Sequence, residues 1–195
     1  ADTPSSPDPE VYAKRMMTRI EKGFTFLKMD IGIQLIRDIP GALVGAGAWN
    51  LSEEWTDEPG TYGMAKHPFT RIQITDLGLD KLTEYVHKVR EIIGYEIPLA
   101  ADHFGHFDLN TSIQLGRAVD KYRLAWLEDL VPWFYTDQWK DISTELNTPT
   151  LTGEDIYLRE GFKDLIEKNA VDMIQPDLAT AGGILETKKI GDLAQ

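Results

Sequence analysis

Three carboxylates follow one another at equal intervals in this chain. Asp102, Glu128 and Glu154 are separated by 26 residues in each case, and each one ends a short apolar run. A helix-like segment follows each run, so the pattern predicts repeated βα units. In such units, successive parallel strands lie side by side and end at one rim. We therefore expect the three carboxylates to converge at neighbouring strand ends of a (β/α) barrel.

Converging carboxylates predict a bound cation. Without one, the three acids would repel each other and their pKa values would rise. Oxygen ligands of this kind favour Mg²⁺, so we predict a Mg²⁺ site with Asp102, Glu128 and Glu154 as ligands. A single acid at a strand end is more often a helix N-cap, but Glu is a poor N-cap, which weakens that alternative for the set.

The predicted elements alternate along most of the chain. Strands are expected near residues 27, 100, 126, 152 and 175, and helices over 11–22, 80–93, 110–122, 137–146, 158–168 and 184–195. Asp8, followed by Pro9, is the expected N-cap of the first helix, and Asn110 or Ser112 that of the third. Strands that alternate with helices indicate a parallel sheet, and we predict an α/β fold of the TIM-type (β/α) barrel.

One long insertion, at about residues 31–78, interrupts this alternation. It is rich in Gly, Pro and Trp and has no sustained period. Loops of this length are often lids or binding loops, and Tyr62 and Arg71 are our candidates for substrate contact. The alternative is an oligomer contact, or a surface excursion that packs on itself.

Composition excludes several other classes of protein. The formal net charge is −12 and no basic stripe occurs, which argues against nucleic acid and anionic membranes as partners. The chain has no Cys, which excludes a disulfide scaffold, a thiolate zinc site and a cysteine nucleophile. No apolar run reaches the roughly 18 residues of a membrane span. The first residues lack the features of a signal peptide, and we expect a cytoplasmic location.

Strand periodicity indicates which side chains share a face. Lys28 and Asp30 lie on one face of the first strand, together with Phe24 and Phe26. If that face is inward, Lys28 and Asp30 point toward the three acids. The residues two positions before the strand-end acids are expected on the same face as those acids: Ala100, Trp126, Thr152 and Gln175.

Short sequence motifs around these residues indicate a resemblance to a known family. Asp102, the word LED with Glu128, TGED with Glu154, and IQPDLATAGGILE at 174–186 resemble the barrel domain of the enolase superfamily, mandelate racemase/muconate lactonizing enzyme group. The resemblance covers roughly residues 23–195 apart from the insertion. It implies that the chain, as a single partial domain over 1–195, holds roughly strands 2 to 6 of the barrel.

The resemblance also implies roles for individual residues. Asp102, Glu128 and Glu154 match the Mg²⁺ ligands of the family. Lys28 matches the first Lys of a Lys-x-Lys pair, and Asp177 matches the acid that orients a catalytic His on the following strand. Such enzymes bind a carboxylate substrate to Mg²⁺, remove the α-proton and stabilise the resulting enediolate. Close to Mg²⁺, the pKa of Lys28 would be depressed; the alternative for Lys28 is an ordinary salt bridge to one of the acids.

The chain departs from the family pattern at two places. Asp30 replaces the second Lys of the pair, which argues against a racemase with two opposed bases. Phe104 stands where Asn or His is frequent, and it is a candidate for substrate contact. His106 shares the parity of Asp102 and could protonate a leaving hydroxyl, whereas His103 should point away.

These features predict a Mg²⁺-dependent acid-sugar dehydratase, a hydro-lyase that expels the β-hydroxyl after α-proton removal. An epimerase, racemase or cycloisomerase of the same superfamily is the first alternative. A non-catalytic barrel-like binding protein is the second. We expect the N-terminal capping domain and the last barrel strands to be absent from these 195 residues, which would then be inactive alone, and a homo-oligomer for the full-length protein.

Overall fold

A computed structural model describes residues 7–44, 73–102 and 107–195. Its central sheet has five parallel strands in the order β1-β4-β5-β6-β7. These strands are β1 (Leu27–Asp30), β4 (Leu99–Asp102), β5 (Leu127–Glu128), β6 (Thr150–Thr152) and β7 (Met173–Ile174). The helices are α1 (Pro9–Glu21), α2 (Asp76–Ile93), α3 (Leu109–Val119), α4 (Thr136–Glu145), α5 (Leu158–Glu167) and α6 (Gly183–Leu193), with short 3₁₀ turns η1 (Ile33–Leu35) and η5 (Asp120–Tyr122).

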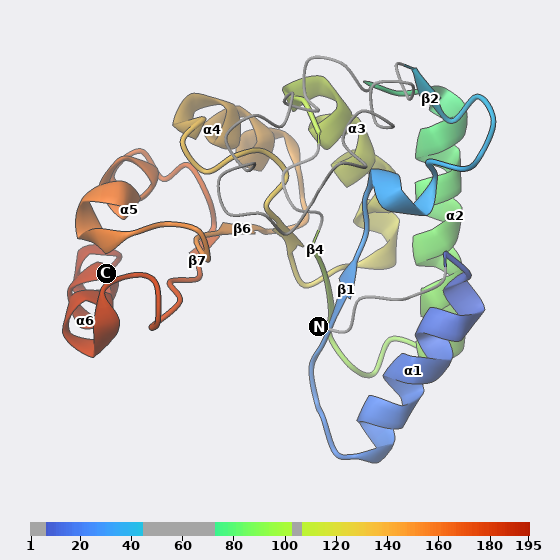
Figure 1. Ribbon diagram of the computed structural model, residues 1–195, viewed down its shortest axis with the longest axis horizontal. Helices are drawn as coiled ribbons and strands as arrows, with labels where there is room; N and C mark the ends of the chain where they lie inside the picture. The colour runs from blue at the N-terminus through green and yellow to red at the C-terminus, as the bar shows by residue number, and fades with distance from the viewer. Residues whose placement is uncertain (1–6, 45–72, 103–106) are drawn as a thin grey trace, which may run out of the picture.

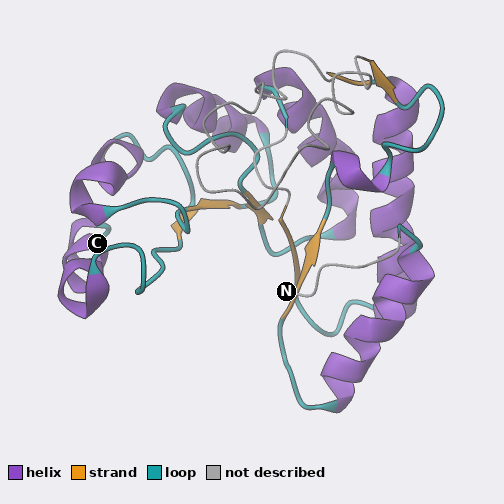
Figure 2. Ribbon diagram, viewed as in Figure 1, coloured by secondary structure: helices purple, strands orange, loops and turns teal. Residues whose placement is uncertain are grey.

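The strands curve, and the helices follow them as an outer arc (Figures 1 and 2). In Figure 1 the arc runs from α1 and α2 through α3 and α4 to α5 and α6, with the strands on its concave side. A curved parallel sheet with helices on its outer face is the arrangement of a (β/α) barrel. The predicted fold class and the five predicted strands are therefore confirmed.

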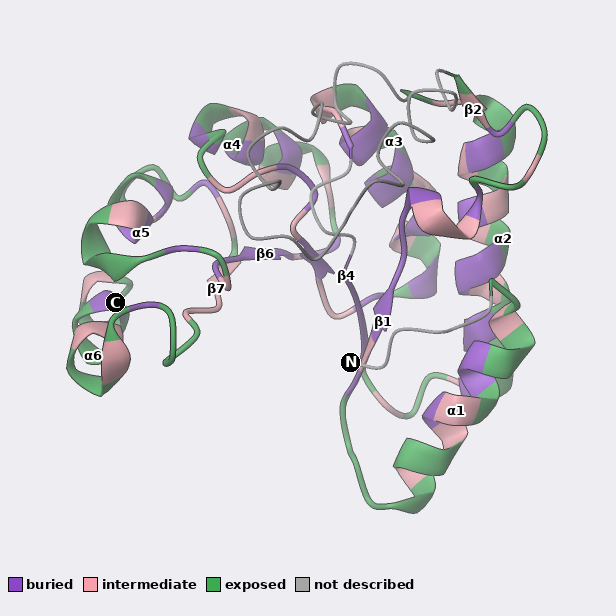
Figure 3. Ribbon diagram, viewed as in Figure 1, coloured by how far each residue is buried: buried purple, intermediate pink, exposed green. Residues whose placement is uncertain are grey.

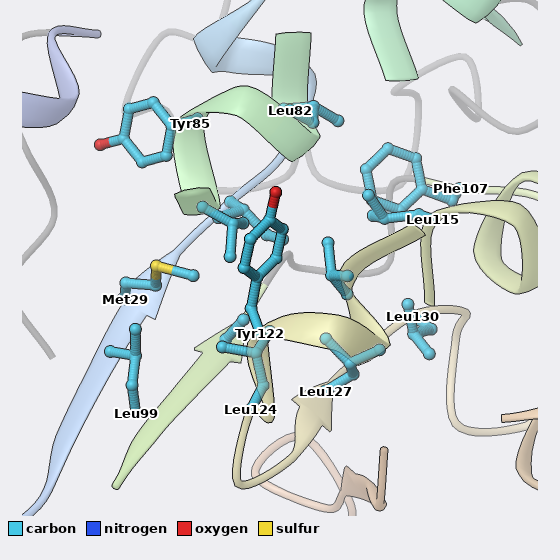
Figure 4. Close-up of a cluster of buried hydrophobic side chains, with 14 of the residues drawn as sticks. Met29, Leu82, Tyr85, Leu99, Phe107, Leu115, Tyr122, Leu124, Leu127 and Leu130 are labelled. Carbon is cyan, nitrogen blue, oxygen red and sulfur yellow. The ribbon is translucent and has the colours of Figure 1, made fainter. Parts of the chain in front are cut away.

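The hydrophobic core lies between the strands and the helices. Alternate strand residues, namely Leu27, Met29, Leu99, Ala101 and Leu127, belong to one buried cluster. Figure 3 shows the buried sides of the helices turned toward the strands. Figure 4 shows side chains from both layers meeting in this cluster, among them Met29, Leu82, Leu99, Leu115, Tyr122 and Leu127. The intervening strand residues therefore face the concave side of the sheet.

Helix starts follow local capping chemistry. Asp8 accepts a hydrogen bond from the backbone N–H of Glu10, as predicted for the N-cap of α1. The cap of α3 is Asp108, which accepts from the N–H of Thr111; the prediction of Asn110 or Ser112 was wrong. The helix includes both of those residues because it begins at Leu109, directly after Asp108, whose carboxylate accepts from the first turn.

The helix α2 begins four residues earlier than predicted. Its N-cap is Thr75, whose hydroxyl accepts a hydrogen bond from the N–H of Gly78. Strands β2 (Leu43–Val44) and β3 (Gln73–Ile74) pair antiparallel immediately before it. A Cβ at Gly78 would overlap the carbonyl oxygen of Ala42, so glycine permits this close approach of α2 to the hairpin. Both ends of the insertion are thereby fixed beside α2.

Among the described residues, every helix is too short or too polar to cross a membrane. This finding agrees with the absence of long apolar runs in the sequence.

Candidate active site

Two metal-ligand candidates lie side by side at the carboxyl ends of β4 and β5. The register pairs Asp30 with Asp102 and Asp102 with Glu128, so these three residues form one row across the sheet. Lys28 pairs with Ala100 one row below. The predicted convergence of Asp102 and Glu128 at one rim is therefore present in the structure.

Lys28 joins the two carboxylates. Its Nζ lies 2.8 Å from Asp102 Oδ2 and 2.9 Å from Glu128 Oε1. The exposed fraction of the side chain is 17% for Lys28, 3% for Asp102 and 1% for Glu128, so the ion pairs are shielded from water. Burial alone would lower the pKa of Lys28, but hydrogen bonds and charge from the two carboxylates outweigh it and raise the pKa above its ordinary value. Lys28 therefore makes the salt bridges that were the alternative to a neutral base.

The second oxygen of Glu128 has its own donor. The indole Nε1 of Trp126 lies 2.9 Å from Glu128 Oε2. The Trp126 ring stacks on Phe26, with ring centroids 4.8 Å apart and planes 18° apart. Both aromatic residues precede a site residue by two positions and so lie on the concave face, as the periodicity predicted for them.

Asp129 joins the acidic cluster, and the sequence patterns did not identify it. Carboxylate oxygens of Asp102, Glu128 and Asp129 lie within 4.8 Å of one another. The φ of Asp129 is 51°, in the left-handed region, so the alternation of β5 ends there. The Thr152 hydroxyl donates to Asp129 Oδ1 over 2.6 Å. Burial raises the pKa of Asp129 to about 7 against the opposing Thr152 bond, and the negative charges of Asp102, Glu128 and Glu154 act in the same direction as burial.

Glu154, the third predicted ligand, follows the end of β6 and is not part of the group of Asp102, Glu128 and Asp129 oxygens that lie within 4.8 Å of one another. Gly153 has a φ of 146°, and a Cβ there would lie 2.9 Å from the backbone N and O of Gln175. Glycine is therefore required where the chain leaves β6 beside β7. Burial raises the pKa of Glu154, and the charge of Asp102 adds to this effect while Lys28 opposes it. Glu154 is thus within electrostatic range of the other acids.

Thr152 does not share the face of the acids, contrary to the periodicity. The register pairs Glu128 with Leu151, so Leu151 is the inward residue of β6. Thr150 faces outward, where its hydroxyl lies 2.6 Å from that of Ser143 on α4. The strand ends at Thr152, and the turn at Gly153 rather than strand alternation sets the position of Glu154.

The remaining described candidates lie around this cluster. Asp30 is 2% exposed, and its backbone N–H donates to the Tyr12 hydroxyl over 3.0 Å. Burial raises the pKa of Tyr85 on α2, and the negative charge of Asp30 adds to this effect. Asp177 is exposed and caps a turn by accepting from the N–H of Ala179. Their predicted catalytic roles stay predictions.

The other candidates lie outside the described residues. They are His106, Phe104, Tyr62 and Arg71, together with His103. Their predicted roles in protonation and substrate contact stay predictions as well.

The cluster suits a divalent cation chemically. It gathers carboxylate oxygens within a few ångströms, and oxygen is the ligand atom that hard divalent cations prefer. Lys28 supplies one positive charge beside these acids, while burial, together with the neighbouring negative charges, raises the pKa values of Asp129 and Glu154. Such a site can hold a cation beside an amine that transfers a proton.

Curated relatives of the chain are enzymes that act on acid sugars by name. A D-xylonate dehydratase of Haloferax volcanii is 37% identical over 116 residues, which are 60% of this chain and 28% of that protein. A D-mannonate dehydratase of Rhizorhabdus wittichii is 27% identical over 175 residues, which are 90% of this chain and 41% of that protein. The chain thus spans less than half the length of these relatives.

Solved structures share the fold over nearly the whole chain. A mandelate racemase/muconate lactonizing enzyme-like protein from Rubrobacter xylanophilus has a TM-score of 0.73 and 29% identity, covering 95% of this chain and 40% of that one. The 3,6-anhydro-D-galactonate cycloisomerase from Zobellia galactanivorans has a TM-score of 0.69 and 26% identity, covering 96% of this chain and 41% of that one.

The family model described as enolase C-terminal domain-like matches residues 11–195. This match covers the five parallel strands and every site residue described above. The chain therefore belongs to the enolase C-terminal domain-like family.

Proposed function

We propose that the intact protein carrying this chain is a Mg²⁺-dependent acid-sugar dehydratase. The reaction would remove the proton α to a sugar carboxylate and expel the β-hydroxyl. The dehydratase names of the relatives and the acidic cluster support the proposal. The single observation that carries it is the position of Lys28, a partly buried amine held between two carboxylates at the strand ends.

Asp102, Glu128 and Glu154 would hold Mg²⁺, with Asp129 as a further carboxylate beside them. When bound, Mg²⁺ would supply positive charge for the substrate carboxylate as the α-proton leaves. Lys28 would accept that proton. Hydrogen bonds and charge from Asp102 and Glu128 raise its pKa, so neutralising the charge of those two carboxylates would lower the pKa and allow the neutral amine to accept a proton.

The other proposed roles complete the reaction. His106 would protonate the leaving hydroxyl, and Asp177 would orient a catalytic His. Asp30, which is in register with Asp102 and so lies in the same row as Asp102 and Glu128, would take part in catalysis. Phe104, Tyr62 and Arg71 would contact the sugar. We further propose that the protein is a cytoplasmic homo-oligomer.

Incubation of the intact protein with Mg²⁺ and a panel of acid sugars in D₂O tests the reaction type. We expect a 2-keto-3-deoxy acid from at least one substrate. If the recovered substrate contained deuterium and no keto acid formed, the assignment would change from a dehydratase to an epimerase or racemase. An isomeric product without loss of water would favour a cycloisomerase, a candidate supported by the structural similarity to the Zobellia enzyme. Mg²⁺ binding without turnover across the panel would favour a binding protein.

Two isosteric substitutions test the ligand assignment. Glu154→Gln and Asp129→Asn each remove one negative charge and keep the side-chain size. We expect Glu154→Gln to weaken Mg²⁺ binding, measured by calorimetry, more than Asp129→Asn does, because Asp129 is already engaged by Thr152. The reverse order would make Asp129 the third ligand in place of Glu154.

A further inference from the structure

Glu128 is held from two sides by donors of different kinds. Lys28 Nζ approaches Oε1 at 2.9 Å, and Trp126 Nε1 approaches Oε2 at 2.9 Å. A carboxylate oxygen accepts two hydrogen bonds, so neither donor exhausts the oxygen that it contacts. The two donors together fix the rotation of the carboxylate plane.

The two donors differ in what a cation would do to them. Lys28 is positively charged and contacts Oδ2 of Asp102 and Oε1 of Glu128. It therefore competes with any cation for those two oxygens. The indole of Trp126 is neutral, donates only and contacts the other oxygen. Trp126 can therefore keep Glu128 oriented whether or not Lys28 remains in contact with it.

The indole is itself supported. Phe26 stacks on Trp126 with ring planes 18° apart, and both rings lie on the concave face of the sheet. Ala100, the β4 residue in register with Lys28, is fully buried and lies on that same face. Because β4 separates β1 from β5, the two aromatic side chains meet across this strand.

We propose that Trp126 is a positioning residue for the metal ligand Glu128, with Phe26 holding the indole in place. The proposal rests on the metal role of Glu128 given under the proposed function. Hydrogen bonds to metal-ligating carboxylates orient them, and their loss typically weakens metal binding by about 10–100-fold. Trp126→Phe removes the N–H and keeps an aromatic ring.

The test is Mg²⁺ affinity without substrate, measured by calorimetry on the intact protein. We expect Trp126→Phe to weaken Mg²⁺ binding by about 10–100-fold, with a melting temperature close to that of the wild type. The matched control is Trp133→Phe, which alters an indole that packs edge-on to Phe134, with centroids 5.6 Å apart. Its Mg²⁺ affinity should stay within twofold of wild type.

A spectroscopic readout separates positioning from general loosening. Mg²⁺ should change the tryptophan fluorescence of the wild type and of Trp133→Phe, and this change should be lost in Trp126→Phe. If Trp126→Phe does not fold, Phe26→Leu carries the test, with an expected Mg²⁺ affinity between wild type and a tenfold loss.

Three outcomes would overturn the proposal. Wild-type affinity in Trp126→Phe and Phe26→Leu would show that Glu128 needs no such support, while the proposed metal site would stand. Equal losses in Trp126→Phe and Trp133→Phe would assign both to packing. A wild-type protein that does not bind Mg²⁺ at all would remove the proposed metal site together with this role.

Discussion

Two cationic side chains, the partly buried Lys28 and the buried Arg90, lie at opposite ends of the parallel strands. Lys28 contacts the carboxylates of Asp102 and Glu128 at the carboxyl ends. Arg90, 3% exposed on α2, donates instead to backbone carbonyls near the amino ends of β4 and β5. Its bonds reach four carbonyl oxygens, those of Gly94, Ile97, Tyr122 and Arg123.

The groups that each cationic side chain contacts indicate a structural role for Arg90 and a chemical role for Lys28. Arg90 fastens three chain segments through neutral groups, and burial lowers its pKa without nearby acids to reverse the effect. Lys28 sits among acids that raise its pKa. The carbonyls around Arg90 are satisfied by one rigid fork, whereas the acids around Lys28 keep more negative charge than one amine neutralises. The amino end is therefore organised for stability, and the carboxyl end for binding a charged ligand.

The largest effect is expected from a substitution at the carboxyl ends of the strands. Lys28→Met should lower turnover by about 10²–10⁴-fold, because a general base contributes an effect of that size and Met cannot accept a proton. Mg²⁺ affinity should persist or rise, since a competing positive charge is removed. Steady-state kinetics and calorimetry on the intact protein measure both. Turnover within tenfold of wild type would remove Lys28 from the reaction.

The matching change at the amino end should act on stability. Arg90→Met leaves several buried carbonyls without donors, and we expect a loss of about 3 kcal/mol in the free energy of unfolding by urea. Mg²⁺ affinity of the folded protein should not change. Arg123→Met is the control, because the exposed Arg123 side chain also stacks on Tyr95 but its loss should cost under about 0.5 kcal/mol. Equal losses in the two variants would contradict the assignment of Arg90.

A substitution that strains the backbone at the carboxyl end of β6 tests how the position of Glu154 depends on Gly153. Gly153→Ala should cost about 2 kcal/mol, because the new Cβ would press on the Gln175 backbone at a φ that L-residues avoid. Displacement of Glu154 should also weaken Mg²⁺ binding. The control is Gly191→Ala in α6, where a Cβ would meet nothing within 4 Å. That variant should gain about 0.5–1 kcal/mol from helix propensity.

The smallest expected effect is pH-dependent and belongs to the amino end. Burial would raise the pKa of Asp120, but hydrogen bonds from Thr148 and Asn147 outweigh it and lower the pKa. A lowered pKa stabilises the fold above the ordinary value near 4, and this contribution is lost as pH falls through the folded-state pKa. Asp120→Asn should therefore cost about 1 kcal/mol at pH 7 and progressively less in acid, measured by urea unfolding. A difference independent of pH would contradict this cause.

Sequence periodicity predicted the site where strands are regular and failed where they end. Asp102 and Glu128 were placed correctly relative to each other because both close regular strands. Asp129 was missed, since alternation puts adjacent residues on opposite faces, and its positive φ was not visible in the sequence. Thr152 was misplaced for the related reason that β6 stops before Glu154.

The hydrogen-bonding roles of side chains were harder to foresee than their positions. Trp126 was expected on the concave face, but its bond to Glu128 depends on the rotamer of the indole. Arg90 showed no signal, because its partners are backbone carbonyls that any sequence provides. The Asp8 cap was predictable because its partners are local, within the next two residues.

The antiparallel pair of β2 and β3 has a consequence for how much the length of the segment between them can vary. Leu43 pairs with Ile74, and the Thr75 hydroxyl donates to the carbonyl oxygen of Gly41 over 2.7 Å, so the polypeptide departs and returns at a single clamped point. Closure entropy grows only slowly with length once such a clamp exists. The number of residues between the two strands can therefore change at a small entropic cost while the Leu43–Ile74 pair and the Thr75–Gly41 hydrogen bond hold the flanking chain in place.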